Sequence, residues 1–211
     1  MDVVAGRQVA RVGLMGGTFD PIHLAHLVTA EAALEQYQLD KVIFIPTGLP
    51  PHKQDHPVTD AEHRFNMVTL AAAGNERFEV SRIEIEREGP SFTVDTLEEM
   101  ARRLPPGSRL YFITGADAIL GIESWREPDR LFRLCRFIAA LRPGIPVERA
   151  REGLRRLEER YSSRILEVEA PALDISSSDI RRRVTASRSI RYLVPDAVEA
   201  YIRKHGLYRS G

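Results

Sequence analysis

Short apolar runs rich in β-branched residues alternate along this chain with longer stretches whose apolar residues recur at helical spacing. The runs predicted to be strands are Val9–Met15, Lys41–Pro46, Phe78–Ile85, Leu110–Thr114, Arg136–Leu141 and Ile165–Val168. The stretches predicted to be helices are Leu24–Tyr37, Ala61–Ala73, Val94–Leu104, Pro146–Tyr161 and Asp196–His205. Strands that alternate with helices of about 10–15 residues indicate βαβ crossovers, and therefore a mostly parallel sheet.

Several of the predicted strands are apolar throughout, as in the segments VIFI and YFI. Strands of that kind suit a sheet that is covered on both faces. We therefore expect an α/β fold, a Rossmann-like doubly wound sheet with helices on both faces. In such sheets the ligand lies at the carboxyl ends of the strands, near the point where the strand order reverses. Functional residues are thus expected in the loops that follow the strands.

The size and charge of the chain narrow the classes of protein that it can represent. Its 211 residues predict a single domain over residues 1–211. With 30 basic and 30 acidic side chains it lacks the basic excess of a protein that coats nucleic acid. No apolar run approaches the ~20 residues of a membrane span, and the single cysteine, Cys135, cannot form an internal disulfide. We expect a cytoplasmic protein with no nucleic-acid or membrane partner, which could form a homo-oligomer.

The loop after the first predicted strand reads GGTFDPIHLAH and begins at Gly16. Glycines there let the backbone approach a ligand closely, and the N–H groups at the start of the next helix attract anions. Pro21 is placed as a residue of the first helical turn. The loop matches neither the Rossmann glycine fingerprint nor the Walker A motif, which has a lysine after its last glycine.

Two histidines, His23 and His26, are three residues apart and so share one face of a first helical turn. Imidazole groups there can hydrogen-bond a phosphate or offset negative charge that develops on it. A zinc site is the alternative, but no third histidine or cysteine ligand stands at suitable spacing. We therefore predict no bound metal among the site residues.

This loop resembles the signature of the nucleotidyltransferase superfamily with an H-x-G-H motif, which transfers a nucleotidyl group from a nucleoside triphosphate. The resemblance implies that both histidines bind the triphosphate, His26 being the more critical, together with the first-loop residues Gly16, Gly17, Thr18 and Phe19. Ala25 stands where that motif has glycine, which would matter only if the backbone there needed a positive φ.

The second loop contains Pro50, Pro51, His52 and Lys53, which resemble the PPHK segment of nicotinate mononucleotide (NaMN) adenylyltransferases. The resemblance implies that Lys53 approaches the phosphate of the acceptor nucleotide, a point-charge role that suits lysine. Taken alone, the segment would be read as a solvated surface loop.

The third loop, GPSFTVDTL from Gly89, is similar to the G-P-S-[YF]-T-x-D-T-L stretch of the same enzymes. Ser91 or Thr93 can cap the helix that follows, whose free N–H groups could receive a carboxylate. The resemblance implies that the backbone around Thr93 holds the nicotinate carboxylate.

The fourth loop carries Gly115-Ala116-Asp117, which resembles the G-A-D motif of this family and implies that Asp117 lies on the ATP side of the cleft. A first-turn aspartate of a helix is the competing interpretation. The resemblance also implies that Trp125, the only tryptophan, packs on the nicotinate ring, with the backbone N–H of Arg126 near its carboxylate. A tryptophan in a helical core is the usual alternative. The family often has an aromatic residue in place of Arg126.

Near the end of the chain, DISSSDIR resembles the I-S-S-[ST]-x-I-R signature of the family. Hydroxyl groups at a helix start, with Arg181 one turn later, can form a second phosphate cradle, although a serine N-cap explains them too. The resemblance implies ATP contacts for Ile175, Ser177 and Ser178. It also implies that a helical portion, about residues 175–208, completes the ATP site.

Together these motifs predict adenylyl transfer from ATP to NaMN, giving deamido-NAD and pyrophosphate in NAD biosynthesis. The acceptor phosphate is already anionic, so catalysis consists of positioning and charge stabilisation, with His23, His26 and Arg181 as catalytic residues. Mg²⁺ is expected to arrive with ATP, because no carboxylate cluster is visible that would cage it. Nicotinamide mononucleotide or phosphopantetheine as acceptor, and a catalytically silent nucleotide-binding module, are the alternatives.

Overall fold

The structure, a computed structural model, describes residues 10–49, 58–141, 146–163 and 165–209. Its strands are β1 (Arg11–Gly17), β2 (Lys41–Pro46), β3 (Phe78–Val80), β4 (Arg109–Gly115), β5 (Arg136–Ala140) and β6 (Leu166–Val168). Its helices are α1 (Leu24–Gln36), α2 (Ala61–Ala72), α3 (Thr93–Arg103), α4 (Ala116–Leu120), α5 (Pro128–Leu134), α6 (Val147–Tyr161), α7 (Ser177–Thr185) and α8 (Asp196–Lys204), with a 3-10 turn η1 (Ile122–Ser124). No helix in these ranges is both long and apolar enough to cross a membrane.

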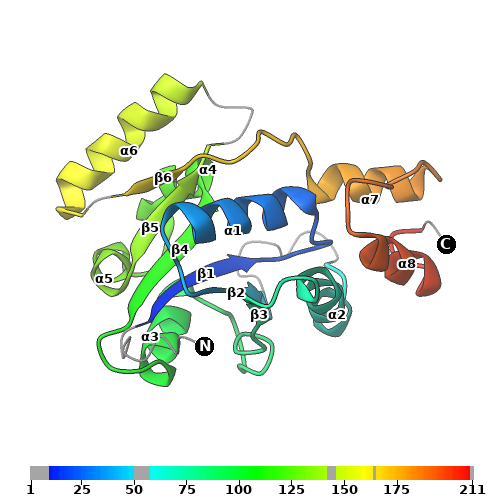
Figure 1. Cartoon of the computed structure of the whole chain (residues 1–211), viewed down its shortest axis with the longest axis horizontal. Coiled ribbons are helices and arrows are strands. Elements are labelled where there is room, and N and C mark those ends of the chain that lie inside the picture. The colour runs from blue at the N-terminus through cyan, green and yellow to red at the C-terminus, as the bar shows by residue number, and fades with distance from the viewer. Residues whose placement is uncertain (1–9, 50–57, 142–145, 164, 210–211) are drawn as a thin grey trace, which may run out of the picture.

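In the described ranges the strands form one sheet in the order β3-β2-β1-β4-β5-β6, and every pairing of neighbours is parallel (Figure 1). The chain runs outward from β1 to β3 and then returns to place β4 beside β1. The strand order therefore reverses between β1 and β4, and the loops after these two strands lie where a ligand is expected.

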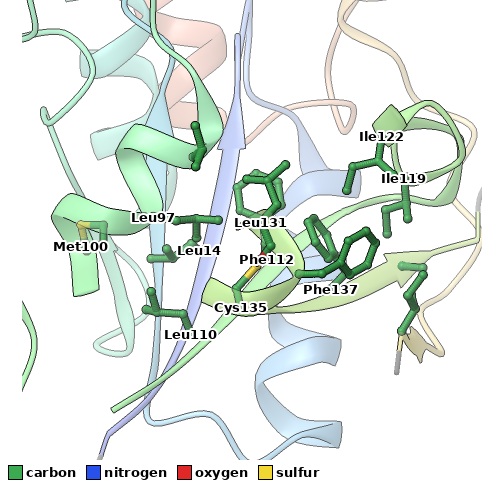
Figure 2. Close-up of a cluster of buried hydrophobic side chains, with 14 of the residues drawn as sticks. Leu14, Leu97, Met100, Leu110, Phe112, Ile119, Ile122, Leu131, Cys135 and Phe137 are labelled. Carbon is green, nitrogen blue, oxygen red and sulfur yellow. Dashed lines mark hydrogen bonds between the residues drawn. The ribbon is translucent and has the colours of Figure 1, made fainter. Parts of the chain in front are cut away.

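Successive strand residues enter opposite cores, because side chains alternate between the two faces of a sheet. Leu14 and Phe112 belong to the core beneath α3, α4, α5 and α6, which Figure 2 shows. Met15 and Tyr111, their neighbours in sequence, belong to the core beneath α1, α2, α7 and α8. The sheet is thus buried on both faces, and the predicted doubly wound α/β fold is confirmed.

Two local predictions are wrong, those for the end of β3 and for Pro21, and one helical segment is missing from the predicted helices. β3 ends at Val80 rather than Ile85, because the chain leaves the ladder and turns over residues 83–89. The segment 116–134, for which no helix was predicted, forms α4, η1 and α5, each of which is too short to show a helical period. Pro21 precedes the N-cap residue His23 instead of lying in the first turn of α1, and its peptide bond with Asp20 is cis.

Candidate active site

The two glycines of the first loop are the last residues of β1, paired with Ile45 and Pro46 of β2. A Cβ atom at Gly16 would lie 3.3 Å from the Phe112 ring, and one at Gly17 would lie 3.1 Å from the Phe19 ring. The absent side chains therefore make room for two aromatic rings at the carboxyl end of the strand.

Phe19 is a buried residue of the first loop whose ring contacts the His26 side chain. It is buried in a left-handed conformation (φ 49°), and its ring meets the His26 ring edge-on with 5.1 Å between centroids. Left-handed backbone is uncommon for a residue with a Cβ atom, and such strain concentrates at functional sites. The contact with Phe19 thus restricts the orientation of the His26 ring.

The rings of His23 and His26 stack on each other at the start of α1, with centroids 3.7 Å apart, and thus lie on one side as their spacing predicts. His23 is the N-cap residue and only 3% exposed, whereas His26 is partly exposed. The backbone N–H of His23 donates to Nδ1 of His26 (3.2 Å). Because Nδ1 accepts, a neutral His26 ring carries its proton on Nε2 and can donate from there. Ala25 lies within α1 and needs no positive φ, so a methyl group is compatible with its backbone.

The first turn of α7 packs against this loop, although Ser177 and Pro21 are 156 residues apart in sequence. The Ser177 hydroxyl donates to the carbonyl of Pro21 (2.9 Å), and Nη1 of Arg181 donates to the carbonyl of Asp20 (2.8 Å). Ser176 caps the helix by accepting from the N–H of Asp179 (3.1 Å). The predicted meeting of the DISSSDIR segment with the first loop is therefore confirmed, and so is the serine cap.

The neighbouring residues of this segment take different positions. Ile175 is partly buried against the core beneath α1 and α7. Ser178 is exposed, with its Oγ 3.5 Å from Nη2 of Arg181. Ser178 thus lies beside the same guanidinium group that binds the first loop through Asp20.

A clasp formed by Asp20 and Tyr208, which local sequence patterns did not indicate, holds the first loop to the C-terminal segment. Asp20 is 5% exposed; its Oδ1 accepts from the Tyr208 hydroxyl (2.7 Å) and its Oδ2 from the N–H of Thr59 (3.3 Å). Burial, followed by the charge of Asp20, raises the pKa of the Tyr208 phenol well above its usual range. The phenol therefore stays protonated and remains a donor.

We expect Tyr208→Phe to lower the free energy of unfolding by about 1.5–3 kcal/mol, the range for a hydrogen bond to a charged group. The reason is that Asp20 then keeps a buried charge with one donor fewer. Urea denaturation measures the change, with Tyr192→Phe as the matched control, because Tyr192 is 72% exposed. Equal stabilities of the two variants would contradict the clasp.

Arg64, on α2, forms hydrogen bonds with three different loop segments. Although it is charged, its side chain is 1% exposed. It donates to the carbonyls of Thr59 (2.8 Å), Thr18 (2.8 Å) and Gly48 (3.1 Å). Burial lowers the pKa of its guanidinium, an effect opposed by the charge of Asp20. Arg64 thus sets the spacing between the loops after β1 and β2.

The third loop begins α3 without the predicted side-chain cap. Phe92 is the N-cap residue, and its side chain makes no capping hydrogen bond. Ser91 points elsewhere, with its Oγ 3.4 Å from the Glu84 carbonyl, while Thr93 is the first helical residue. The expectation that Ser91 or Thr93 caps this helix is therefore wrong.

Glu84 is a buried carboxylate beside this third loop, which sequence patterns also did not indicate. It accepts from the Thr96 hydroxyl (2.8 Å), and burial raises its pKa. Its carbonyl oxygen would lie 2.1 Å from a Cβ at Gly48, so the second and third loops meet closely at this point. Only glycine fits there without moving the backbone.

The fourth loop and the segment after it carry Asp117 and Arg126, which are exposed, and Trp125, which is partly buried. Asp117 is exposed in the first turn of α4, where a carboxylate complements the helix dipole. Trp125 is partly buried, its ring edge-on to Phe112 at 6.1 Å between centroids. The Arg126 guanidinium lies over the Phe92 ring at 4.7 Å, and 4.0 Å from Asp95. Its side chain therefore joins this loop to the start of α3.

Two further predictions concern Lys53 and metal binding. Lys53, with the whole PPHK segment, lies outside the described residues. Within the described ranges, no three His, Cys, Asp or Glu side chains form a group that could hold a metal ion.

The family model described as cytidylyltransferase-like matches residues 14–183, from the middle of β1 through most of α7. The chain belongs to this family. It is 59% identical over 199 residues to a probable nicotinate-nucleotide adenylyltransferase of Moorella thermoacetica, covering 94% of this chain and 92% of that protein. A protein of the same description from Thermus thermophilus is 49% identical, with 94% and 100% covered. These matches confirm the resemblance to the nicotinate-nucleotide adenylyltransferases.

The fold of this chain is also similar to that of solved structures. A Plasmodium falciparum nicotinic acid mononucleotide adenylyltransferase complexed with NaAD superposes with a TM-score of 0.76 at 22% identity, covering 94% of this chain and 97% of that one. At that identity the superposition speaks for a shared fold, and it agrees with the sheet order described above.

Proposed function

We propose that this chain transfers the adenylyl group of ATP to nicotinate mononucleotide, giving deamido-NAD and pyrophosphate. The observation that carries the proposal is the sequence identity of 59% and 49% with two probable nicotinate-nucleotide adenylyltransferases, in each case over 94% of this chain. The geometry agrees, because two stacked histidines, a strand end without side chains and the first turn of α7 meet at the switch point of the sheet. Such a place suits an anionic nucleotide.

In the proposed reaction an oxygen of the acceptor phosphate attacks the α-phosphorus of ATP, and the bond to the pyrophosphate group breaks. The Nε2–H of His26 donates to the phosphate oxygens on which negative charge develops. His23 holds the His26 ring, and Arg181 offsets the charge of the triphosphate. No general base is required, because the acceptor phosphate is already ionised. Mg²⁺ enters bound to ATP.

The remaining residues are proposed in two groups. Gly16, Gly17, Thr18, Phe19, Asp117, Ile175, Ser177 and Ser178 line the ATP side. Lys53, Thr93, Trp125 and Arg126 line the acceptor side. The single domain, the cytoplasmic location and a homo-oligomer stay predictions from the sequence.

Product analysis by mass spectrometry tests the acceptor. The purified protein is incubated with ATP, Mg²⁺ and, in separate reactions, nicotinate mononucleotide, nicotinamide mononucleotide or phosphopantetheine. We expect deamido-NAD to form far faster than the other products. Preferred NAD formation would retain adenylyl transfer but overturn the acceptor assignment around Thr93. ATP binding without any product would favour a silent nucleotide-binding module.

A further inference from the structure

A cavity is lined by residues of α7, of α8 and of the segments that follow them, beyond the turn of α7 that meets the first loop. Figure 1 shows these two helices at the C-terminal end of the chain. The cavity's volume of about 540 Å³ falls within the range of roughly 300–1,000 Å³ typical of small-molecule sites. Val184, Ile190 and Ile202 form an apolar part of its lining, and Ser187 and Ser189 add hydroxyl groups. The cavity thus combines an apolar surface with hydrogen-bonding groups.

Three guanidinium groups, of Arg188, Arg203 and Arg209, also line this cavity. Across the described ranges, none of the three makes an ion pair or a side-chain hydrogen bond. In contrast, Arg182 and Arg183 of the adjoining helix both pair with Asp179. The only carboxylate in the lining is that of Glu199. The cavity therefore carries an excess of positive charge in a chain whose formal net charge is zero.

Helix dipoles explain part of this charge. Arg203 lies in the last turn of α8 and Arg188 just beyond the end of α7, where a cation interacts favourably with the helix C-terminus. That effect accounts for one cation at each helix end. It does not account for Arg209, which follows both helices, or for the apolar lining that the three side chains surround.

We propose that this cavity binds a phosphorylated small molecule that also has an apolar part, separately from the candidate active site. Guanidinium groups donate paired N–H groups in a geometry that matches phosphate oxygens. The hydroxyl groups of Ser187 and Ser189 supply further donors, and the apolar lining accepts the rest of the ligand.

The cavity adjoins the elements that hold the first loop. The Thr185 hydroxyl, which lines the cavity, lies within hydrogen-bond distance of the carbonyls of Arg181 (3.1 Å) and Tyr208 (2.9 Å). Arg209 directly follows Tyr208, whose hydroxyl binds Asp20. A ligand in the cavity therefore contacts neighbours of Arg181 and Tyr208, two of the residues that anchor the first loop.

Amide NMR of the full-length chain tests the site, with inorganic phosphate and phenyl phosphate as probes. We expect resonances of residues 184–190 to shift, and phenyl phosphate to bind more tightly because its ring covers apolar surface. The double variant Arg188→Gln/Arg203→Gln should weaken phenyl phosphate binding by at least about tenfold, as loss of charged hydrogen bonds implies. Glu199→Gln should tighten it, because it removes a repelling charge.

The matched control is Arg149→Gln/Arg155→Gln, which removes two exposed arginines of α6 and changes the net charge equally. It should bind phenyl phosphate as the parent does. Shifts confined to residues 16–26 and 177–181 would overturn the proposal, because the probe would then occupy only the candidate active site. Equal losses in both double variants, or no loss in either, would also overturn it.

Discussion

Replacing His26 by alanine is expected to lower kcat by about 10²–10³-fold, the usual effect of removing one preorganised donor to a developing charge. The affinity for ATP should change little, because the strand end, His23 and the first turn of α7 remain. The reason lies in how the ring is held: Phe19 meets its edge, His23 stacks on its face, and its Nδ1 accepts from a backbone N–H. Nε2 is thereby fixed as the donor.

Single-turnover kinetics and equilibrium titration with ATP separate the two effects. His26→Gln, which can offer a side-chain N–H, should recover part of the lost rate. His205→Ala is the matched control, because His205 is exposed at the end of α8 and should leave kcat unchanged. A His26→Ala enzyme with the parent kcat would remove His26 from the mechanism, and a large loss of ATP affinity would make it a binding residue instead.

The fold could be predicted because its signal is local and repeated. Each crossover contributes an apolar strand and a helical period, and a parallel sheet buried on both faces demands such strands. The helices of segment 116–134 were not predicted, because α4 and α5 span only 5 and 7 residues. A helical period becomes visible only over two or three turns. The predicted end of β3 was wrong because an apolar residue in a turn can also fill the core, as the buried Ile83 does, so apolar residues alone do not mark where a strand ends.

The candidate site was predictable where residues act within one loop. That His23 and His26 lie on the same side of the chain follows from their spacing, whereas the stacking of their rings is known only from the structure. The contacts that hold the loop in place are different, because Asp20 meets Tyr208 across 188 positions of the chain. No local pattern specifies such a partner. Ser91 shows the same limit, since its hydroxyl faces the Glu84 carbonyl rather than the helix that follows.

Arg64 did leave a trace in the sequence. It stands three, four and eight positions before Met67, Val68 and Ala72, all buried residues of α2. A charged residue on the apolar face of a helix is seldom buried unless it has hydrogen-bond or ion-pair partners. That pattern indicates a buried structural arginine, although the three carbonyls that receive its hydrogen bonds are known only from the structure.

Arg64→Met is therefore expected to lower the free energy of unfolding by about 3–5 kcal/mol, the range for removing one partner from a buried charged network. The carbonyls of Thr59, Thr18 and Gly48 would lose their donor, and Asp20 would lose a neighbouring positive charge. For a domain of this size such a loss lowers Tm by roughly 10 °C. Urea denaturation and calorimetry measure the two quantities.

Arg77→Met is the matched control, because Arg77 pairs with Glu31 at the surface, where such a pair contributes about 0–1 kcal/mol. Arg64→Lys should fall between the two, since one ammonium group cannot reach three carbonyls in the directions of a guanidinium. The Arg64→Met enzyme that remains folded at low temperature should also lose kcat, because Arg64 sets the distance between the loops after β1 and β2. A stability loss equal to that of Arg77→Met would show that these loops hold their spacing without Arg64.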